Sequence, residues 1–465
     1  MEKMRSVLRS YGELFHLSTE AKAEVLKDTT WAHGLRGIAA MMVVCSHLTL
    51  CYARGIIPPC CAPGSTTPSL FQRPLFRLVA SGHSWVAIFF ILMGFVNALA
   101  PLRLARSGQA DKTLSKLASS SFSRIFRLVL PATVATIISW FICNMGLYST
   151  AGLSDAFWLN NTTPLPSANW LKAVQDLLRG LSATWAFGPE NPYDQPQWAL
   201  IYLLQGSFMI ISALFLTATM TPTWRTATLS VLIGWSLNWS WLIGDPWTGL
   251  CCFAGIILAE MSLVGGAEAL SKVSHILSPS SILTGLFLMS YPGGYPDAAS
   301  WSRRMHAFGV RFLPGESVDR MYGSLGGIVL VFGIIISPHA RWVLSQRPLE
   351  WLGKVSFAIY LLHGMLLRTI FAWVLHLGQS LTPFVQTGED GREFYVNRYP
   401  VPGFFQCAFA TMVLAACLAV ASQIWNLKLE PVFGKITTRL ERVATGKSSP
   451  EVKSGEDSIL PTRKD

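Results

Sequence analysis

Arg36 and His47 stand eleven positions apart in a stretch from Trp31 to Tyr52 that, after Arg36, is apolar apart from two small hydroxyls and the His47 imidazole. In a helix this spacing is roughly three turns, so both side chains lie on one face, about 16 Å apart along the axis. If Arg36 marks a membrane surface, His47 lies near the middle of the bilayer, where an ionisable group is costly to hold. A neutral imidazole there can take up a proton as a general base, so His47 is predicted to belong to a functional site.

A second basic pair, Arg124 and Arg127, has the i, i+3 spacing that places both guanidinium groups on one face of a helix. Such a pair suits phosphate or pyrophosphate, which guanidinium groups bind through forked hydrogen bonds. Arginines are also common at membrane edges, where they reach the headgroups and fix topology. From this pair alone, anchoring is the more frequent explanation and phosphate binding is the alternative.

Three more ionisable residues fall in or beside apolar runs. His363 lies about eight residues into the run that begins near Val355, hence about 12 Å from its end and at a depth similar to that of His47. It is either a hydrogen-bonded structural residue or a second member of the site. Arg368 lies deeper on the same run and requires a partner or water. His83, at the far end of the second run, is explained equally well as an interfacial residue.

The composition is that of a membrane protein. Hydrophobic residues make up 51% of the 465 residues and charged residues only 14%, against about 25% in soluble domains. About ten apolar runs of roughly 17–25 residues predict transmembrane helices. They begin near Leu35, Trp85, Phe126, Trp198, Thr226, Trp247, Ile276, Tyr322, Val355 and Phe404. We therefore predict an all-α fold, a polytopic membrane helix bundle with about ten transmembrane helices.

Basic residues in the short segments between these runs predict the orientation. The net charge is +11, and the second connection alone holds Arg103, Arg106, Arg124 and Arg127. Such segments stay in the cytoplasm, so the charge requires no nucleic-acid partner and places both termini on the cytoplasmic side. The predicted parts are a cytoplasmic N-terminal segment (1–30), a transmembrane domain (31–430) and a cytoplasmic, disordered tail (431–465).

The opposite side is predicted to hold the acidic connection from Leu153 to Gln197. Asn160 and Asn161 each begin a glycosylation sequon in this connection. A third sequon, at Asn238, lies inside an apolar run and is predicted to stay unmodified. Most of the nine cysteines lie inside apolar runs, no CxxC spacing occurs, and the sequence predicts no metal site.

Taken together, these segments resemble the acyltransferase 3 family. Arg36, ten intervening residues and His47 are similar to the opening signature of that family, and Arg124-x-x-Arg127 is similar to a second motif. The resemblance continues, in the expected order, through Val86–Phe95, Gln197–Ser207 and Trp351–His363. It covers residues 35 to 363 and implies a bundle of about ten helices.

The resemblance implies an enzyme that transfers an acyl group, often acetyl, from cytoplasmic acyl-CoA to a hydroxyl. His47 is then the catalytic base, with Arg36 as a second catalytic residue, and Arg124 and Arg127 bind the phosphates of the donor. Residues expected to line the site are His363, Ser207, Trp198 and His83. No tightly bound cofactor is expected, because acyl-CoA, with acetyl-CoA favoured, is a co-substrate. The expected partners are the lipid bilayer and a small hydroxylated acceptor, by analogy a secondary metabolite, and the expected location is the endoplasmic reticulum.

The chain departs from the family pattern at two positions. Leu203 stands where fungal-type members have a glutamate, and Met93 stands where the family has a serine before Gly94. The missing carboxylate keeps open the alternative of an inactive acyltransferase-like scaffold. A further alternative, a small-molecule permease, does not explain why the two arginine motifs occur together with His47.

Overall fold

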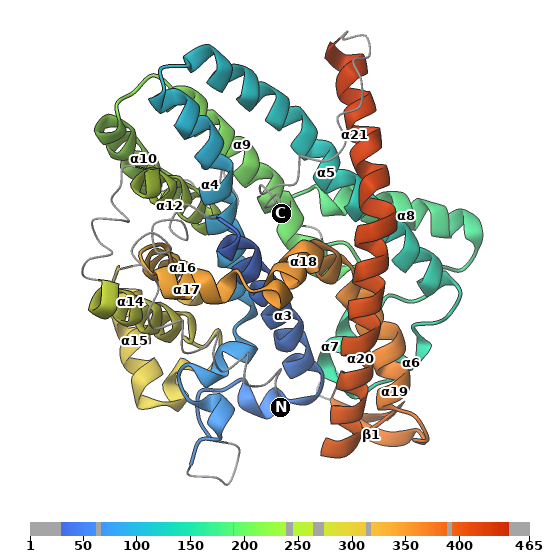
Figure 1. The fold of residues 1–465 in the computed structure, drawn as a ribbon. Coiled ribbons are helices and arrows are strands. Elements are labelled where there is room, and N and C mark those ends of the chain that lie inside the picture. Colours follow the sequence, from blue (N-terminus) through green and yellow to red (C-terminus); the bar gives the residue numbers. More distant parts are fainter. Residues whose placement is uncertain are drawn as a thin grey trace, which may run out of the picture.

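The computed structural model describes residues 29–61, 67–188, 190–238, 245–263, 274–312, 318–387 and 393–445. These residues form a bundle of helices with α3 near its centre (Figure 1). Eight helical stretches among them are long and apolar enough to cross a membrane, which confirms the predicted polytopic bundle. They are built from α3 (Trp31–Tyr52), α4 (Gly82–Arg106), α5 (Ala110–Asn144), α9 (Ala199–Thr217), α12 (Pro246–Leu263), α16 (Val318–Ile335), α18 (Arg347–Leu366) with α19 (Ala372–Leu375), and α20 (Phe404–Ile424) with α21 (Glu430–Thr445). Of the predicted N-terminal segment, residues 1–28 lie outside the described residues.

Two of the ten predicted spans form shorter helices. Helices α10 (Pro222–Leu237) and α14 (Ser274–Met289) each have 16 residues. Their length of about 24 Å is less than the roughly 30 Å of a hydrocarbon core. Helix α10 packs along α12, and α14 packs along α16.

Contacts at the two ends of the bundle show in which direction these helices run. At one end, Glu260 of α12 pairs with Arg106 at the end of α4 (3.1 Å) and with Arg225 near the start of α10 (2.8 Å). At the other, Ser84 at the start of α4 donates to the carbonyl of Met289 at the end of α14 (2.9 Å). Helices α4 and α12 therefore run one way, and α10 and α14 the other, as ten alternating crossings require. We call the end with Glu260 the basic end and the opposite end the far end.

Glycines let the central helix α3 approach α18 closely. A Cβ atom on Gly37 would lie 2.7 Å from the backbone nitrogen of Gly353, so a larger residue does not fit there. In the same way, a Cβ atom on Gly94 of α4 would lie 3.1 Å from the Cα atom of Gly255 of α12. Small residues are typical of such membrane helix interfaces, because they let backbones pack against each other. The Gly37 contact fixes the register of α3 against α18.

Helix α18 continues through a π-helical segment, Leu367–Phe371, into α19. A π-helical turn interrupts the regular hydrogen-bond ladder and is frequent at functional sites. This one carries Arg368, which is completely buried.

The C-terminal part of the chain is more ordered than its composition predicts. Helix α20 passes through a second π-helical segment, Trp425–Leu429, into α21. The prediction of a disordered tail from residue 431 is therefore wrong for residues 431–445. The carboxylate of Glu441 accepts hydrogen bonds from Ser119 (2.6 Å) and Ser123 (3.2 Å) of α5, so α21 packs against that helix. Residues 446–465 lie outside the described residues.

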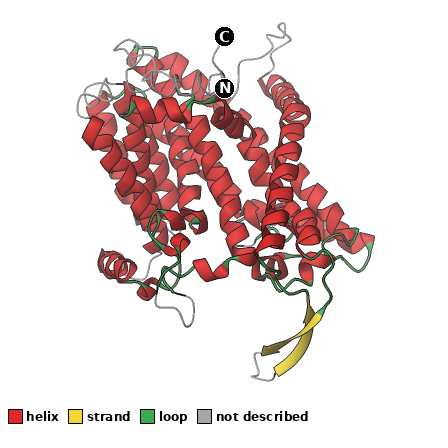
Figure 2. Cartoon of the chain, turned by 60° about the horizontal axis from the view of Figure 1, so that its bottom comes forward, coloured by secondary structure: helices red, strands yellow, loops and turns green. Residues whose placement is uncertain are grey.

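Short elements join the long helices. They are 3-10 turns at Arg54–Ile56, Leu70–Gln72, Phe76–Ala80, Gln195–Trp198 and Pro296–Ala298, and helices α6 (Ser149–Gly152), α7 (Phe157–Thr162), α8 (Trp170–Thr184), α15 (Ser300–Phe312) and α17 (Pro338–Leu344). A hairpin of two antiparallel strands, β1 (Thr382–Thr387) and β2 (Glu393–Arg398), projects from one end of the bundle (Figure 2). The all-α prediction did not include this hairpin.

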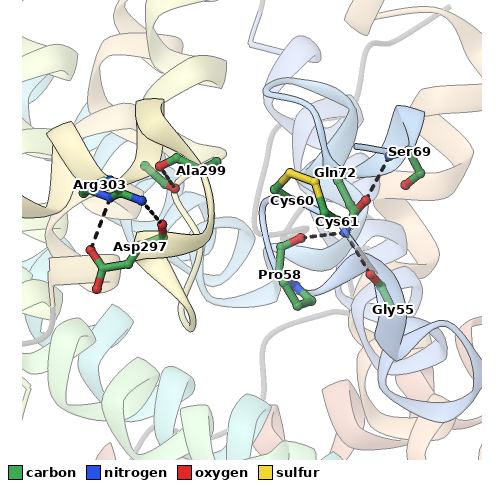
Figure 3. The surroundings of a disulfide bond; sticks show 10 residues. Gly55, Pro58, Cys60, Cys61, Ser69, Gln72, Asp297, Ala299 and Arg303 are labelled. Atoms are coloured by element: carbon green, nitrogen blue, oxygen red, sulfur yellow. Dashed lines mark hydrogen bonds and ion pairs between the residues drawn. A yellow bond between two sulfur atoms is a disulfide. The ribbon is translucent and has the colours of Figure 1, made fainter. Parts of the chain in front are cut away.

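The connection between α3 and α4 is held by one glutamine and contains a disulfide bond between neighbouring residues. Cys60 and Cys61, which are neighbours in sequence, are bonded to each other (Figure 3). The buried side chain of Gln72 donates to the carbonyls of Gly55 (2.9 Å) and Pro58 (3.2 Å) and accepts from the amide of Ser69 (2.9 Å). The contacts of Gln72 hold this loop together before α4 begins at Gly82.

Candidate active site

His47 and His363 are in direct contact, although 316 positions separate them in the sequence. Nε2 of His363 lies 3.0 Å from Nδ1 of His47, and the two rings are stacked with centroids 5.0 Å apart. His363 is completely buried, whereas His47 is only half-buried and keeps some accessible surface. The structure therefore brings together the two histidines that the sequence placed at similar depths.

The position of His47 along α3 differs from the predicted one. Arg36 lies five residues after the start of α3, and His47 lies five residues before its end. Each is thus about 8 Å from an end of the helix. Arg36 therefore does not lie at the end of α3, and His47 lies in the half of α3 nearer the far end.

His363 is anchored to its own helix. Its Nδ1 atom lies 2.7 Å from the carbonyl oxygen of Tyr360 and 3.2 Å from that of Ile359. The hydroxyl of Tyr360 in turn donates to the carbonyl of Pro196, in the 3-10 turn before α9. This part of α18 is therefore held on both sides, by its own backbone and by the turn at Pro196.

Trp158 of α7 lies between His47 and Arg368. Its ring centroid is 5.0 Å from that of His47, and the Arg368 guanidinium carbon is 5.2 Å from the indole ring. Arg368 donates from its two terminal nitrogens to the carbonyls of Tyr193 (2.8 Å) and Thr162 (2.7 Å), which offsets part of the cost of its burial, and its Nε atom has no hydrogen-bond partner among the described residues. Trp158 was not singled out from the sequence, because a tryptophan in a polar connection gives no signal that it folds back onto the bundle.

A second group of residues surrounds His83 at the start of α4. The ring of His83 is 5.5 Å from that of Trp198, and the guanidinium of Arg320 lies over the same indole at 5.4 Å. Arg320 is paired with the carboxylate of Asp245. Trp198 also lines a cavity of about 130 Å³ together with Tyr202 and residues of the 183–191 region. The side chain of His83 is exposed and lies within electrostatic range of His47.

Asp194 is a buried carboxylate that sequence reasoning missed, because it appeared to be one of several surface acids. It is 1% exposed, and its Oδ2 atom accepts from the amide of Gln197 (2.9 Å). Its Oδ1 atom has no hydrogen-bond partner among the described residues. Burial raises the pKa of Asp194 to about 7, against the opposing effect of the nearby Arg368. Through Gln197 it joins a buried polar network that also contains Thr136, Thr184 and Asn191.

The predicted donor-binding residues gather nearer the basic end. Arg36 donates to the carbonyl of Gly353 (2.7 Å). Glu430, at the start of α21, lies within electrostatic range of both Arg36 and Arg127, and Arg124 lies within range of Arg127. The Nε atoms of Arg36 and Arg124 are buried and have no hydrogen-bond partner among the described residues. The structure thus brings the three arginines into one basic cluster, about 16 Å along α3 from His47.

Ser207 joins the two positions at which the chain departs from the family pattern. Its hydroxyl donates to the carbonyl of Leu203 (2.8 Å) and lies 3.2 Å from the sulfur of Met93. Met93 and Leu203, the two positions that depart from the family pattern, therefore lie at one location beside Ser207. There, the serine and glutamate of the family pattern are replaced by two apolar residues. The contacts of Ser207 are with Met93 and Leu203 rather than with His47.

The predicted glycosylation sites are not equivalent. Asn161 is exposed, whereas the side-chain amide of Asn160 is half-buried and donates to the carbonyls of Gly152 (3.0 Å) and Ser154 (3.2 Å). Asn238 directly follows the last residue of α10 and its side chain is exposed, whereas the sequence predicted an inaccessible position inside an apolar run. The other two residues of its sequon lie outside the described residues. No group of three or more metal-binding side chains occurs in the part of the chain that the structure describes.

Comparison with known proteins gives consistent results. A family model described as an acyltransferase domain matches residues 29–425. The chain is 27% identical to the O-acetyltransferase PaAT-1 of Phomopsis amygdali, over 75% of this chain and 74% of that protein. It is 24% identical to acyltransferase clz18 of Cochliobolus lunatus (74% and 85%) and 23% identical to acyltransferase R4 of a Phoma strain (90% and 97%). No solved structure shows a significant match.

Proposed function

The chain belongs to the acyltransferase domain family, and on that premise we propose that it transfers an acyl group from acyl-CoA to a hydroxyl group of a small acceptor. The observation that carries this proposal is the arrangement along α3. One part of this helix carries Arg36 in a basic cluster, and about three turns away the same helix carries the imidazole of His47, which keeps some accessible surface and contacts His363. A donor with phosphates at one end and a thioester at the other suits this separation.

We propose His47 as the general base of the transfer. It takes the proton from the acceptor hydroxyl while that oxygen forms a bond to the carbonyl carbon of the thioester. The carbon–sulfur bond then breaks, and the thiolate of CoA receives the proton from the His47 imidazolium. The imidazole is thus regenerated, and the products are an ester and free CoA.

The basic cluster is the proposed site for the phosphates of the donor. Arg36 and Arg124 each have a buried, unpartnered Nε–H group among the described residues, and a guanidinium group binds phosphate through paired, charge-assisted hydrogen bonds. The carboxylate of Glu430 lies within electrostatic range of Arg36 and Arg127. It offsets part of the positive charge of the cluster when no donor is bound.

The proposed acceptor is small, largely apolar and hydroxylated. Trp198, whose ring contacts His83, lines a cavity together with Tyr202, and these aromatic rings favour an apolar molecule over a polymer. Acetyl is the proposed acyl group, since one relative is an O-acetyltransferase. By analogy with the fungal relatives, we propose a secondary metabolite as acceptor and the endoplasmic reticulum as location.

Purified protein in lipid nanodiscs, given radiolabelled acetyl-CoA and extracts of host cells, tests this function. Release of free CoA with appearance of a labelled, acylated product supports the enzyme. Binding of acetyl-CoA without turnover would instead indicate the scaffold. Transport of a solute into sealed proteoliposomes that contain the protein, without donor binding, would indicate the permease.

A further inference from the structure

We propose that His363 is a positioning residue that fixes the tautomer of His47, so that Nε2 is the basic nitrogen of His47. This inference rests on the proposed function, in which His47 is the base. It adds the identity of the reacting nitrogen and a role for a residue that was predicted only to line the site.

The first step concerns Nδ1 of His363. Its two neighbours within hydrogen-bond distance are carbonyl oxygens, those of Tyr360 (2.7 Å) and Ile359 (3.2 Å). A carbonyl oxygen can only accept, so Nδ1 must carry the proton. A neutral imidazole has a single N–H group, and Nε2 of His363 is therefore a lone-pair acceptor.

The second step derives the position of the proton on His47 from its position on His363. Nδ1 of His47 lies 3.0 Å from the accepting Nε2 atom, so Nδ1 is the nitrogen that carries the proton of His47. Its other nitrogen, Nε2, is left with a free lone pair. The backbone of α18 thus determines, through one imidazole, which nitrogen of the next imidazole is basic.

The charged form of His363 would leave no such acceptor. It would place a second cation in a completely buried region that already holds the guanidinium of Arg368. No carboxylate lies within ion-pair distance of His363 among the described residues. An unpaired charge is costly in such a place, which favours the neutral ring.

This arrangement also serves the imidazolium that forms during transfer. When Nε2 of His47 takes the proton of the acceptor, its Nδ1–H group remains donated to Nε2 of His363, which orients the ring and stabilises its charge. The logic is that of the aspartate in a serine-protease triad, which holds the correct tautomer without taking up the proton itself. Here a neutral imidazole anchored to a helix backbone takes that place.

Substitution of His363 tests its positioning role, and substitution of a second buried histidine, His376, serves as the control. His376, at the end of α19, is also buried and hydrogen-bonded, to Ser154 (2.7 Å) and Gln379 (2.8 Å), and it has no contact with His47. We expect His363→Leu to lower kcat for CoA release from acetyl-CoA by about 10- to 100-fold, with KM for the donor unchanged. His363→Gln should recover part of that loss, because a carboxamide oxygen can accept from Nδ1–H. His376→Leu should lower the melting temperature without lowering kcat in the surviving fraction.

The outcomes separate this inference from the proposed function. If His363→Leu keeps wild-type kcat while His47→Ala is inactive, the positioning role is wrong and the base assignment stands. If His47→Ala is as active as the wild type, the proposed function itself is wrong.

If the His363 variants do not fold, NMR spectroscopy of the wild-type protein can still test the inferred tautomer of His47. Protein labelled with ¹⁵N-histidine should show His47, assigned by its loss in His47→Ala, with a protonated Nδ1 and an unprotonated Nε2. The opposite tautomer would overturn the inference.

Discussion

Gly364 of α18 lies directly against the carboxylate of Asp194. A Cβ atom at residue 364 would be 2.5 Å from Oδ1 of Asp194 and 3.3 Å from the ring of Pro196. The residue next to His363 must therefore be a glycine for the 190–198 loop to pack on α18. The same loop carries Pro196, whose carbonyl holds Tyr360, so it supports the helical turn that presents His363 to His47.

We expect Gly364→Ala to displace this loop and to destabilise the protein by about 1–3 kcal/mol, the usual effect of overpacking a tight site. The measurement is the melting temperature in detergent, together with the rate of CoA release. Gly434→Ala in α21 is the matched control, because no atom lies within 4 Å of a Cβ atom at that position. Equal effects of the two substitutions would contradict the close contact at Gly364.

Asp194 should give the stability of the protein a distinct pH dependence. Its pKa in the folded protein is about 7, above the ordinary value of about 3.9 for an unfolded chain. Between these values the folded state binds more protons than the unfolded state, so stability falls as pH rises from about 4 to about 7 and is level outside that window. The slope contributed by this group is at most about 1.4 kcal/mol per pH unit.

Melting temperatures of the wild type and of Asp194→Asn, measured from pH 4 to pH 8, check this dependence. The amide cannot ionise, so the variant should lose the decline that Asp194 contributes. A decline of unchanged size in Asp194→Asn would show that other groups cause it.

Replacing the arginines of the basic cluster should weaken donor binding and leave the chemical step intact. Arg124→Ala loses charge-assisted hydrogen bonds, each worth about 1.5–3 kcal/mol, so KM for acetyl-CoA should rise about 10-fold or more. Arg103→Ala is the control, since Arg103 is an exposed arginine at the same end of the bundle. If both variants bind acetyl-CoA like the wild type, Arg124 is a topology anchor only.

The sequence predicted relationships between residues of one helix better than contacts between residues far apart in the chain. The common face of Arg36 and His47 follows from helical periodicity within one segment, and α3 is one uninterrupted helix as expected. The contact between His47 and His363 joins helices that are far apart in the chain. Equal depth made that contact possible, but only the glycine packing of α3 on α18 determines that the two rings face each other.

The wrong or missing predictions share a physical cause, which is that tertiary contacts outweighed local composition. Asp194 has the composition of a surface loop, yet Gln197 and the packing against Gly364 hold it inside. The segment after residue 431 is charged, yet it forms a helix because α5 extends beside it and offers Ser119 and Ser123 to Glu441. Neither partner lies near enough in sequence to reveal the pairing.

Glycosylation should distinguish Asn161 from its neighbour, provided that the far end of the bundle faces the lumen. In a eukaryotic host, and in an Asn238→Gln background that removes the third sequon, Asn161→Gln should abolish the mobility shift that a glycosidase removes, because Asn161 is the exposed residue of the pair. Asn160→Gln should leave the shift unchanged, because the Asn160 amide is already bound to two carbonyls. A shift that depends on Asn160 alone would contradict the described geometry of α7.

Removing the imidazole of His47 is the most direct test of the chemistry. His47→Ala should reduce kcat for acyl transfer by about 10²- to 10⁴-fold, the usual contribution of a general base. Donor binding should be nearly unchanged, since the basic cluster lies about 16 Å away along α3. A purely structural His47 would give a different result, because its loss would leave Nε2 of the buried His363 without its partner and lower the melting temperature without a specific effect on kcat. The measurements are therefore the melting temperature, acetyl-CoA affinity and the rate of CoA release, made on the same preparation. A stable His47→Ala protein that binds acetyl-CoA and acylates at nearly the wild-type rate would exclude His47 as the base.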